Sequence, residues 1–172
     1  MFARTERLLL RPGWGEDAPA LFNAIADEAI IDKLPGTSWP YRAEDAEAFL
    51  LRDRGHDDLP ELLIYARTRG APKLVGGIAL RETGSDETAE LDYWIARPCW
   101  GLGFATEAGQ AVVGMAKDGL RMKLRSGHFP DNPASGRVLE KLGFQPTGEV
   151  EKRWSAVRGQ EVDCLMYEHR PN

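Results

Sequence analysis

Three strand-like runs follow one another in the middle of the chain, and they limit the folds it can adopt. They cover residues 61–68, 73–81 and 89–96, and only short turns rich in Gly, Pro, Ser or charged residues separate them. Antiparallel strands can be joined by such turns, whereas parallel strands need a long crossover. The middle of the chain therefore predicts an antiparallel meander.

Helix and strand patterns on either side complete the expected fold. In order they are a strand at 5–11, helices at 16–29 and 42–55, the meander, a helix from about 104 to 117, a strand at 120–126, a helix at 131–144, and closing strands at 147–154 and 161–168. No repeat or low-complexity segment divides the chain, so we expect one domain over residues 1–172. The order predicts an α+β fold, with a mostly antiparallel mixed sheet of about seven strands flanked by about four helices.

Charge and cysteine content exclude several classes of protein. The net charge is −5, whereas a nucleic-acid-binding domain usually shows a basic surface, so we expect no nucleic-acid partner. No run approaches the roughly 20 apolar residues that span a bilayer, and the leucines at 8–10 are too few for a signal-peptide core. Cys99 and Cys164 form no CxxC pair and have no neighbouring histidine. We therefore expect reduced thiols, a cytoplasmic location, no membrane partner and no metal.

The stretch CWGLGFATEA at 99–108 sets two glycines one residue apart and then turns at once into a helix-forming run. Unpaired N–H groups at a helix N-terminus bind anions, and glycine lets a phosphate approach the backbone without meeting a Cβ. A tight strand-to-helix turn explains two such glycines equally well. The bend alone leaves both interpretations open.

Three phosphate ligands compete for this bend. A Walker A loop needs Gly-Lys followed by Ser or Thr, and no Gly-Lys occurs in the chain. A dinucleotide fingerprint needs Gly or Ala where the chain has Thr106, and it follows the first strand of a parallel series rather than a late meander. The remaining candidate is the pyrophosphate of coenzyme A.

The run ELDYWIARPCWGLGFATEA at 90–108 resembles the acetyl-CoA signature of the GNAT acyltransferase superfamily, in the RimJ/RimL branch of ribosomal-protein N-terminal acetyltransferases. The run NPASGRVLEKLGF at 132–144 is similar to the family's Asn-x-x-Ser helix, and TERLLLRP at 5–12 fits the same branch. The likeness covers nearly the whole chain in the family's order. It implies a GNAT-like fold and an acetyl-CoA-dependent N-acetyltransferase that acts on a primary amine by direct attack in a ternary complex.

The resemblance also implies roles for particular residues. The backbone amides of the bend would hold the pyrophosphate, namely those of Gly101, Leu102, Gly103, Phe104, Ala105 and Thr106. The backbone at Trp94, Ile95 and Ala96 would pair with the pantetheine arm like an added strand. Asn132 and Ser135 would lie beside this arm and the thioester sulfur. Asn132 equally suits a helix N-cap, and Ser135 equally suits a solvent-facing first turn.

Departures from the family pattern bear on the mechanism. Leu139 stands where the superfamily often has a tyrosine general acid, which leaves Ser135 as the candidate donor to the departing sulfur. Asp92 stands where the branch usually has glycine, and Thr147 where it often has glutamate. Glu90 and Asp92 share one face of a strand just before the pantetheine segment, so they are candidate bases that would act through water. A solvated strand face accounts for them equally well.

Several alternatives stay open. The same fold without catalysis would serve as an acyl-CoA-binding sensor or an interaction module. The acceptor would contact residues 31–60 and the last hairpin, and Trp14, Trp39 and Trp154 are the aromatic residues without another role. A protein N-terminus, a polyamine, an aminoglycoside and an amino-acid-like amine all remain possible acceptors. We expect a monomer or a homodimer.

Overall fold

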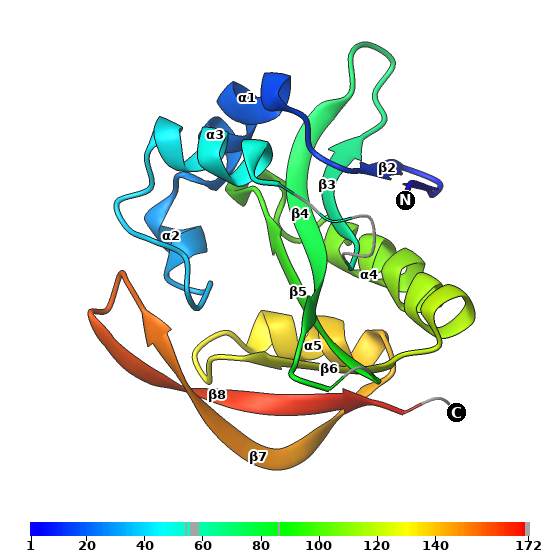
Figure 1. Cartoon of the computed structure of the whole chain (residues 1–172), viewed down its shortest axis with the longest axis vertical. Coiled ribbons are helices and arrows are strands. Elements are labelled where there is room, and N and C mark those ends of the chain that lie inside the picture. The colour runs from blue at the N-terminus through cyan, green and yellow to red at the C-terminus, as the bar shows by residue number, and fades with distance from the viewer. Residues whose placement is uncertain (54, 56–58, 86, 171–172) are drawn as a thin grey trace.

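The computed structural model describes residues 1–53, 55, 59–85 and 87–170, and one eight-stranded sheet runs through it (Figure 1). The strands are β1 (Ala3–Arg4), β2 (Leu8–Arg11), β3 (Glu61–Ala66), β4 (Lys73–Glu82), β5 (Thr88–Ile95), β6 (Lys123–His128), β7 (Phe144–Ser155) and β8 (Gln160–His169). Their spatial order is β1-β2-β3-β4-β5-β6-β8-β7. All neighbours pair antiparallel except β5 and β6. The predicted meander is β3 to β5, and the mostly antiparallel mixed sheet is confirmed.

Five α-helices accompany the sheet in the described part of the chain. They are α1 (Ala18–Ile25), α2 (Glu28–Ile31), α3 (Ala43–Leu51), α4 (Phe104–Gly114) and α5 (Pro133–Lys141). Short 3-10 turns occupy Gly15–Asp17 and Arg97–Cys99, and a π-helical turn at Met115–Leu120 follows α4. Compared with the prediction of about seven strands and about four helices, the structure adds the short β1 and α2. None of the helices in the described ranges is both long and apolar enough to cross a bilayer.

Several element boundaries differ from the prediction: the helix expected at 42–55 ends at Leu51, and β7 begins at Phe144, inside the helix expected at 131–144. Two other differences have a local cause in the backbone. The helix expected at 16–29 is interrupted at Ala26, whose ψ of 58° lies outside the helical range. The Asp27 side chain then caps α2 by accepting from the backbone of the second helical residue. The strand expected at 120–126 begins three residues later, because Arg121 takes a left-handed conformation that ends the π-helical turn.

The alternation of side chains along the strands divides most of the apolar residues between two large cores, and a third, small cluster consists of Phe129, Cys164 and Met166. On β3, Leu62 packs in the core under α4 and α5, whereas Leu63 packs in the core under α1, α2 and α3. On β5 the same alternation places Tyr93 against the α4–α5 core and Trp94 against the α1–α3 core. Neighbouring residues of β5 therefore face two different sets of helices.

Strands β5 and β6 diverge after three residue pairs, the last of which is Glu90 opposite Arg125. At the point of divergence the Ser126 hydroxyl donates to the Leu91 carbonyl at 2.7 Å. Strand β6 continues beside β8, while residues 92–95 of β5 stay paired with β4 on their other side. No strand in the described ranges pairs with residues 92–95 on the β6 side (Figure 1). We call residues 92–95 the open edge of β5.

Candidate active site

The glycine bend between β5 and α4 presents N–H groups without helical partners. Gly101 and Gly103 have φ angles of 77° and 81°, in the left-handed region that favours glycine. A Cβ on Gly101 would have no heavy atom beyond its chain neighbours within 4 Å, so the backbone there is accessible. The N–H of Glu107 bonds to the Gly103 carbonyl at 3.0 Å, and the N–H groups of residues 104–106 before it have no acceptor in the helix. Such a bend can hold an anion.

The N-terminal segment holds this bend in place. The Glu107 carboxylate accepts from Thr5 Oγ1 at 2.6 Å and from Arg7 Nε at 2.7 Å, and Arg7 Nη1 donates to the Leu102 carbonyl at 2.9 Å. Burial raises the pKa of Glu107, but these hydrogen bonds outweigh it and leave the pKa below its usual range. The Arg7 guanidinium also lies 4.8 Å from the centre of the Phe104 ring. Thr5 and Arg7 were missed in the sequence because they lie about 100 residues before their partner.

A groove of about 770 Å³ runs from the bend along α4. Arg7, Gly103 and Thr106 line it at the bend, and Gln110 and Lys141 line it further along. Its volume is within the roughly 300–1,000 Å³ of small-molecule sites. The groove therefore has room for a ligand that continues beyond the bend.

The open edge of β5 leads directly into the bend. Trp94 and Ile95 are the last residues of the strand, and the Ala96 N–H donates to the Val75 carbonyl at 2.8 Å, which keeps the segment beside β4. The Trp100 indole donates to the Ile95 carbonyl at 2.7 Å and folds the start of the bend back onto the strand end. An extended ligand with amide groups can pair with such an edge as an added strand does.

The first turn of α5 approaches β5. Asn132 occupies the N-cap position, where its backbone carbonyl accepts from the Ser135 N–H at 3.1 Å and its side chain makes no capping hydrogen bond. The Tyr93 hydroxyl lies 2.7 Å from Ser135 Oγ and 3.2 Å from the Ser135 carbonyl. A Cβ on Gly136 would lie 2.8 Å from His128 Nε2, so glycine lets α5 pack closely on the sheet. The structure thus brings Ser135 to β5 and adds Tyr93, which the sequence analysis missed.

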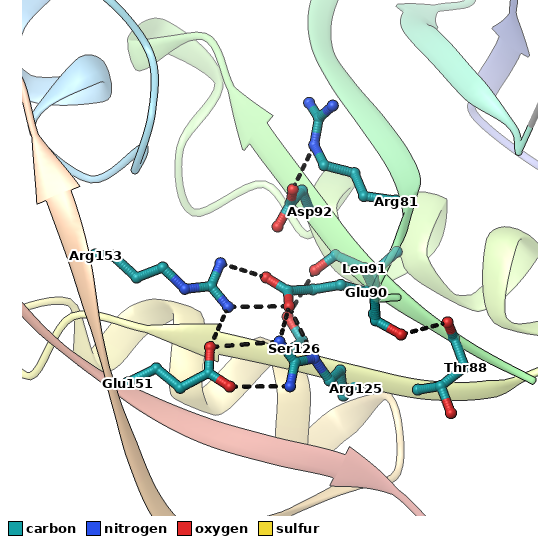
Figure 2. A network of polar contacts seen from close by, with 10 residues as sticks. Arg81, Thr88, Glu90, Leu91, Asp92, Arg125, Ser126, Glu151 and Arg153 are labelled. Atoms are coloured by element: carbon teal, nitrogen blue, oxygen red, sulfur yellow. Dashed lines mark hydrogen bonds and ion pairs between the residues drawn. The ribbon is translucent and has the colours of Figure 1, made fainter. Parts of the chain in front are cut away.

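Glu90 lies at the centre of an ion-pair network, as Figure 2 shows. Its two oxygens accept from Arg153 Nη1 and Nη2 at 2.7 and 3.0 Å and from Arg125 Nε at 2.9 Å. Glu151 accepts from the same two arginines. Only 9% of the Glu90 side chain is exposed. These contacts join β5 to β6 and β7 at the divergence, and they leave Glu90 poorly placed to take a proton from water.

Asp92 has a different environment. One carboxylate oxygen accepts from Arg81 Nε at 2.6 Å (Figure 2). The Asp92 side chain is 40% exposed. Removal of water by the surrounding protein raises the pKa of Asp92, while Arg81 opposes this rise and the negative charge of Glu90 adds to it. Asp92 and Trp94 share the face of β5 toward α1–α3. Of the two carboxylates predicted as bases, Asp92 is therefore the better placed.

The two segments predicted to contact an acceptor, 31–60 and the last hairpin, meet at residues 32–36; residues 54 and 56–58 lie outside the described part of the chain. The Gly36 N–H donates to the Trp154 carbonyl at 3.2 Å, and Arg158 pairs with Asp32 at 2.7 Å. Trp39 packs against the α1–α3 core, whereas Trp154 is 54% exposed. The loop after α2 and the β7–β8 hairpin therefore form one continuous region.

The two cysteines are buried free thiols. Burial raises the pKa of Cys164 to about 11, so its thiol stays protonated near neutral pH and is a poor nucleophile. In the described ranges, no group of three or more His, Cys, Asp or Glu residues is arranged to hold a metal ion.

Replacing Glu90 with glutamine is expected to lower the free energy of unfolding by about 2 kcal/mol, because Arg125 and Arg153 would keep only one negatively charged partner, Glu151. Urea unfolding would measure the loss, and the exposed Glu149→Gln on β7 is the control. Turnover per folded molecule should stay near that of the unaltered protein. Unchanged stability with a large loss of turnover would instead identify Glu90 as the base.

Comparison with known proteins gives the family. Residues 7–145 match the family model described as an acetyltransferase (GNAT) domain. YoaA, an uncharacterized N-acetyltransferase of Bacillus subtilis (strain 168), is 26% identical over 166 residues, which cover 95% of this chain and 93% of YoaA.

Solved acetyltransferase structures share the fold. A GNAT-family acetyltransferase from Bacillus anthracis superposes with a TM-score of 0.82 at 23% identity, over 98% of this chain and 97% of that one. RimL, a ribosomal L7/L12 alpha-N-protein acetyltransferase solved with coenzyme A, gives a TM-score of 0.78 at 20% identity, over 98% and 97% of the two chains. This likeness agrees with the RimJ/RimL-type resemblance in the sequence. Because the family model covers most of the chain, the protein belongs to the GNAT acetyltransferase family and is an N-acetyltransferase.

Proposed function

We propose that the protein transfers an acetyl group from acetyl-CoA to a primary amine, either a protein N-terminal α-amine or a small-molecule amine, by direct attack in a ternary complex. The open edge of β5 carries the proposal, because it runs into the glycine bend at one end and has Ser135 beside it. A ligand with an amide-rich arm and a pyrophosphate fits this arrangement. The coenzyme A bound to the structurally similar RimL supports it.

Three parts of the chain would hold acetyl-CoA. The N–H groups from Gly101 to Thr106 would bind the pyrophosphate, and the backbone at 94–96 would pair with the pantetheine arm. The Asn132 side chain, which makes no capping bond, would reach the same arm. When bound, acetyl-CoA supplies a thioester carbonyl that an amine can attack.

Asp92 and Ser135 lie on opposite sides of the open edge. An α-amine has a pKa of about 7.7–8.0, so a carboxylate that accepts its proton through water is sufficient help. We assign this proton transfer to Asp92 and the hydrogen bond to the departing sulfur to Ser135. A protonated amine first gives one proton, through water, to Asp92. The neutral amine loses a second proton as the amide forms, and the coenzyme A thiolate gains one, so the exchange is balanced. The buried thiols of Cys99 and Cys164 support direct attack over an acyl-cysteine route.

The charge distribution supports an amine as acceptor. Residues 16–53, which form the helical layer on the Asp92 side of the sheet, carry nine Asp or Glu and three Lys or Arg. Three of these acids pair with arginines outside the layer, namely Asp17 with Arg11, Asp27 with Arg97 and Asp32 with Arg158. The negative charge that remains would attract a protonated amine to the site. The RimL likeness makes a protein N-terminus one acceptor to test first. We also propose a cytoplasmic location, which suits two reduced thiols.

Release of coenzyme A thiol from acetyl-CoA with a panel of amines and peptide N-termini tests this function. We expect turnover with at least one acceptor, and initial-rate lines that intersect when both substrates are varied. Parallel lines would indicate an acyl-enzyme and contradict direct attack.

Calorimetry separates the alternatives. Binding of acetyl-CoA without turnover on any acceptor would favour the second candidate, a non-catalytic acyl-CoA sensor or interaction module. Tighter binding of NAD than of acetyl-CoA would contradict the coenzyme A site itself.

A further inference from the structure

The Tyr93 hydroxyl has one proton and two partners, both in Ser135. It lies 2.7 Å from Ser135 Oγ and 3.2 Å from the Ser135 carbonyl oxygen. If Tyr93 donates to the carbonyl, the Ser135 hydroxyl can point its own proton at the Tyr93 oxygen. If Tyr93 donates to Ser135 Oγ, that position is filled and the Ser135 proton must point elsewhere. The direction of the Ser135 proton therefore depends on Tyr93.

We propose that Tyr93 is a positioning residue, whose hydroxyl donates to Ser135 Oγ and so directs the Ser135 proton toward the sulfur of acetyl-CoA. The inference rests on the proposed function of this site. The 2.7 Å contact is the shorter of the two, which favours Ser135 Oγ as acceptor. As the C–S bond breaks, its electron pair stays on sulfur, and the Ser135 proton then faces the growing negative charge. Hydrogen bonds linked in such a chain strengthen one another.

The surroundings of Tyr93 suit a donor that never ionises. Its ring packs against the α4–α5 core. This core includes the buried Leu139, which stands where the superfamily often has a tyrosine general acid. Burial raises the pKa of Tyr93 to about 12, although the hydrogen bond with Ser135 lowers it somewhat. Tyr93 therefore keeps its proton throughout the pH range of an assay. It acts through Ser135 and does not itself lose a proton.

Kinetics of Tyr93→Phe provide the first test. The ring and its packing stay, so we expect a folded protein with an unchanged KM for acetyl-CoA and a kcat about 10-fold lower. In a protein that already carries Ser135→Ala, Tyr93→Phe should not lower kcat further, because Tyr93 acts only through the Ser135 hydroxyl. The pH profile should keep its shape. Tyr167→Phe is the matched control, because it removes a hydroxyl 3.3 Å from His128 on the same side of the sheet, and its kcat should be unaltered.

A merely structural role for Tyr93 predicts different results. In that case kcat would be unchanged in Tyr93→Phe, or it would fall by the same factor with and without the Ser135 hydroxyl. Either result would overturn the inference.

Calorimetry without an acceptor gives a second test that needs no turnover. Tyr93→Phe should weaken binding of coenzyme A about threefold and leave unchanged the binding of an analogue that has hydrogen in place of the thiol. Equal effects on both ligands would overturn the role of Tyr93 while leaving the coenzyme A site in place. Failure of the unaltered protein to bind coenzyme A would overturn the proposed function, and this inference with it.

Discussion

An Asp92→Asn protein is expected to bind acetyl-CoA normally and to lose about 10²-fold in kcat/KM, the usual scale for removal of a general base. Asparagine keeps the size of the side chain and an oxygen that can still accept from Arg81, so the fold and the cofactor edge should be unaffected. Initial rates with a fixed acceptor measure the loss. Asp163→Asn, at an exposed position on β8, is the matched control.

If Asp92 is the base, kcat/KM should decrease at low pH. A base must be deprotonated, so kcat/KM should fall as the pH drops through the pKa of Asp92. Because that pKa is raised, the fall occurs at a higher pH than an ordinary aspartate would give. Deprotonation of a free amine produces a similar limb, but that limb moves when acceptors of different pKa are compared. Full activity of Asp92→Asn, with a limb that follows only the amine, would show that the enzyme takes an already neutral amine.

A Gly103→Val protein is expected to bind acetyl-CoA at least about 10²-fold more weakly, because several charge-assisted hydrogen bonds to the pyrophosphate would be lost together. The φ of 81° at Gly103 is unfavourable for a β-branched residue. The new Cβ would also lie 3.4 Å from Arg7 Nη2 and beside the path of a phosphate. Isothermal titration with acetyl-CoA measures the change.

Gly84→Val separates loss of binding from backbone strain. Gly84 has a φ of 80°, lies in the turn between β4 and β5, and has open space where a Cβ would go. Valine there carries the same conformational cost, about 1–2 kcal/mol, but lies beyond the opposite end of β5 from the bend. We expect similar losses of stability in the two variants and unchanged acetyl-CoA binding in Gly84→Val. Weakened binding in both would mean that general destabilisation, rather than the bend, controls affinity.

The sequence predicted the meander and the glycine bend well because both depend on local patterns. Alternation and turn residues identify β3, β4 and β5 within a few residues of their observed limits. Boundaries were less predictable where a single residue changes conformation. Asp27 is a residue type that favours helix N-caps, which could have divided the helix expected at 16–29. The helical spacing of apolar residues favoured one continuous helix instead.

The chemistry of the site depends on contacts that no local pattern reveals. Glu90 and Asp92 look equivalent on one strand face, yet Arg125 and Arg153, from β6 and β7, bind only the first of them closely. In the sequence Tyr93 has the features of an ordinary core residue. In the structure α5 places Ser135, which lies 42 positions later, against its hydroxyl. Partners so far apart in the chain are brought together by the sheet order, and a single sequence does not give their distances.

At the open edge of β5 the sheet lacks a pairing partner for residues 92–95 in the described part of the chain. If the pantetheine arm fills that place, a small molecule completes the backbone pairing that the polypeptide leaves unfinished, and folding is linked to binding by mass action. At a ligand concentration 100 times the Kd, such linkage adds about 2.7 kcal/mol to the free energy of unfolding. The lifetime of the protein in a cell would then depend on the supply of acetyl-CoA, and starvation for that metabolite would remove the enzyme as well as its substrate.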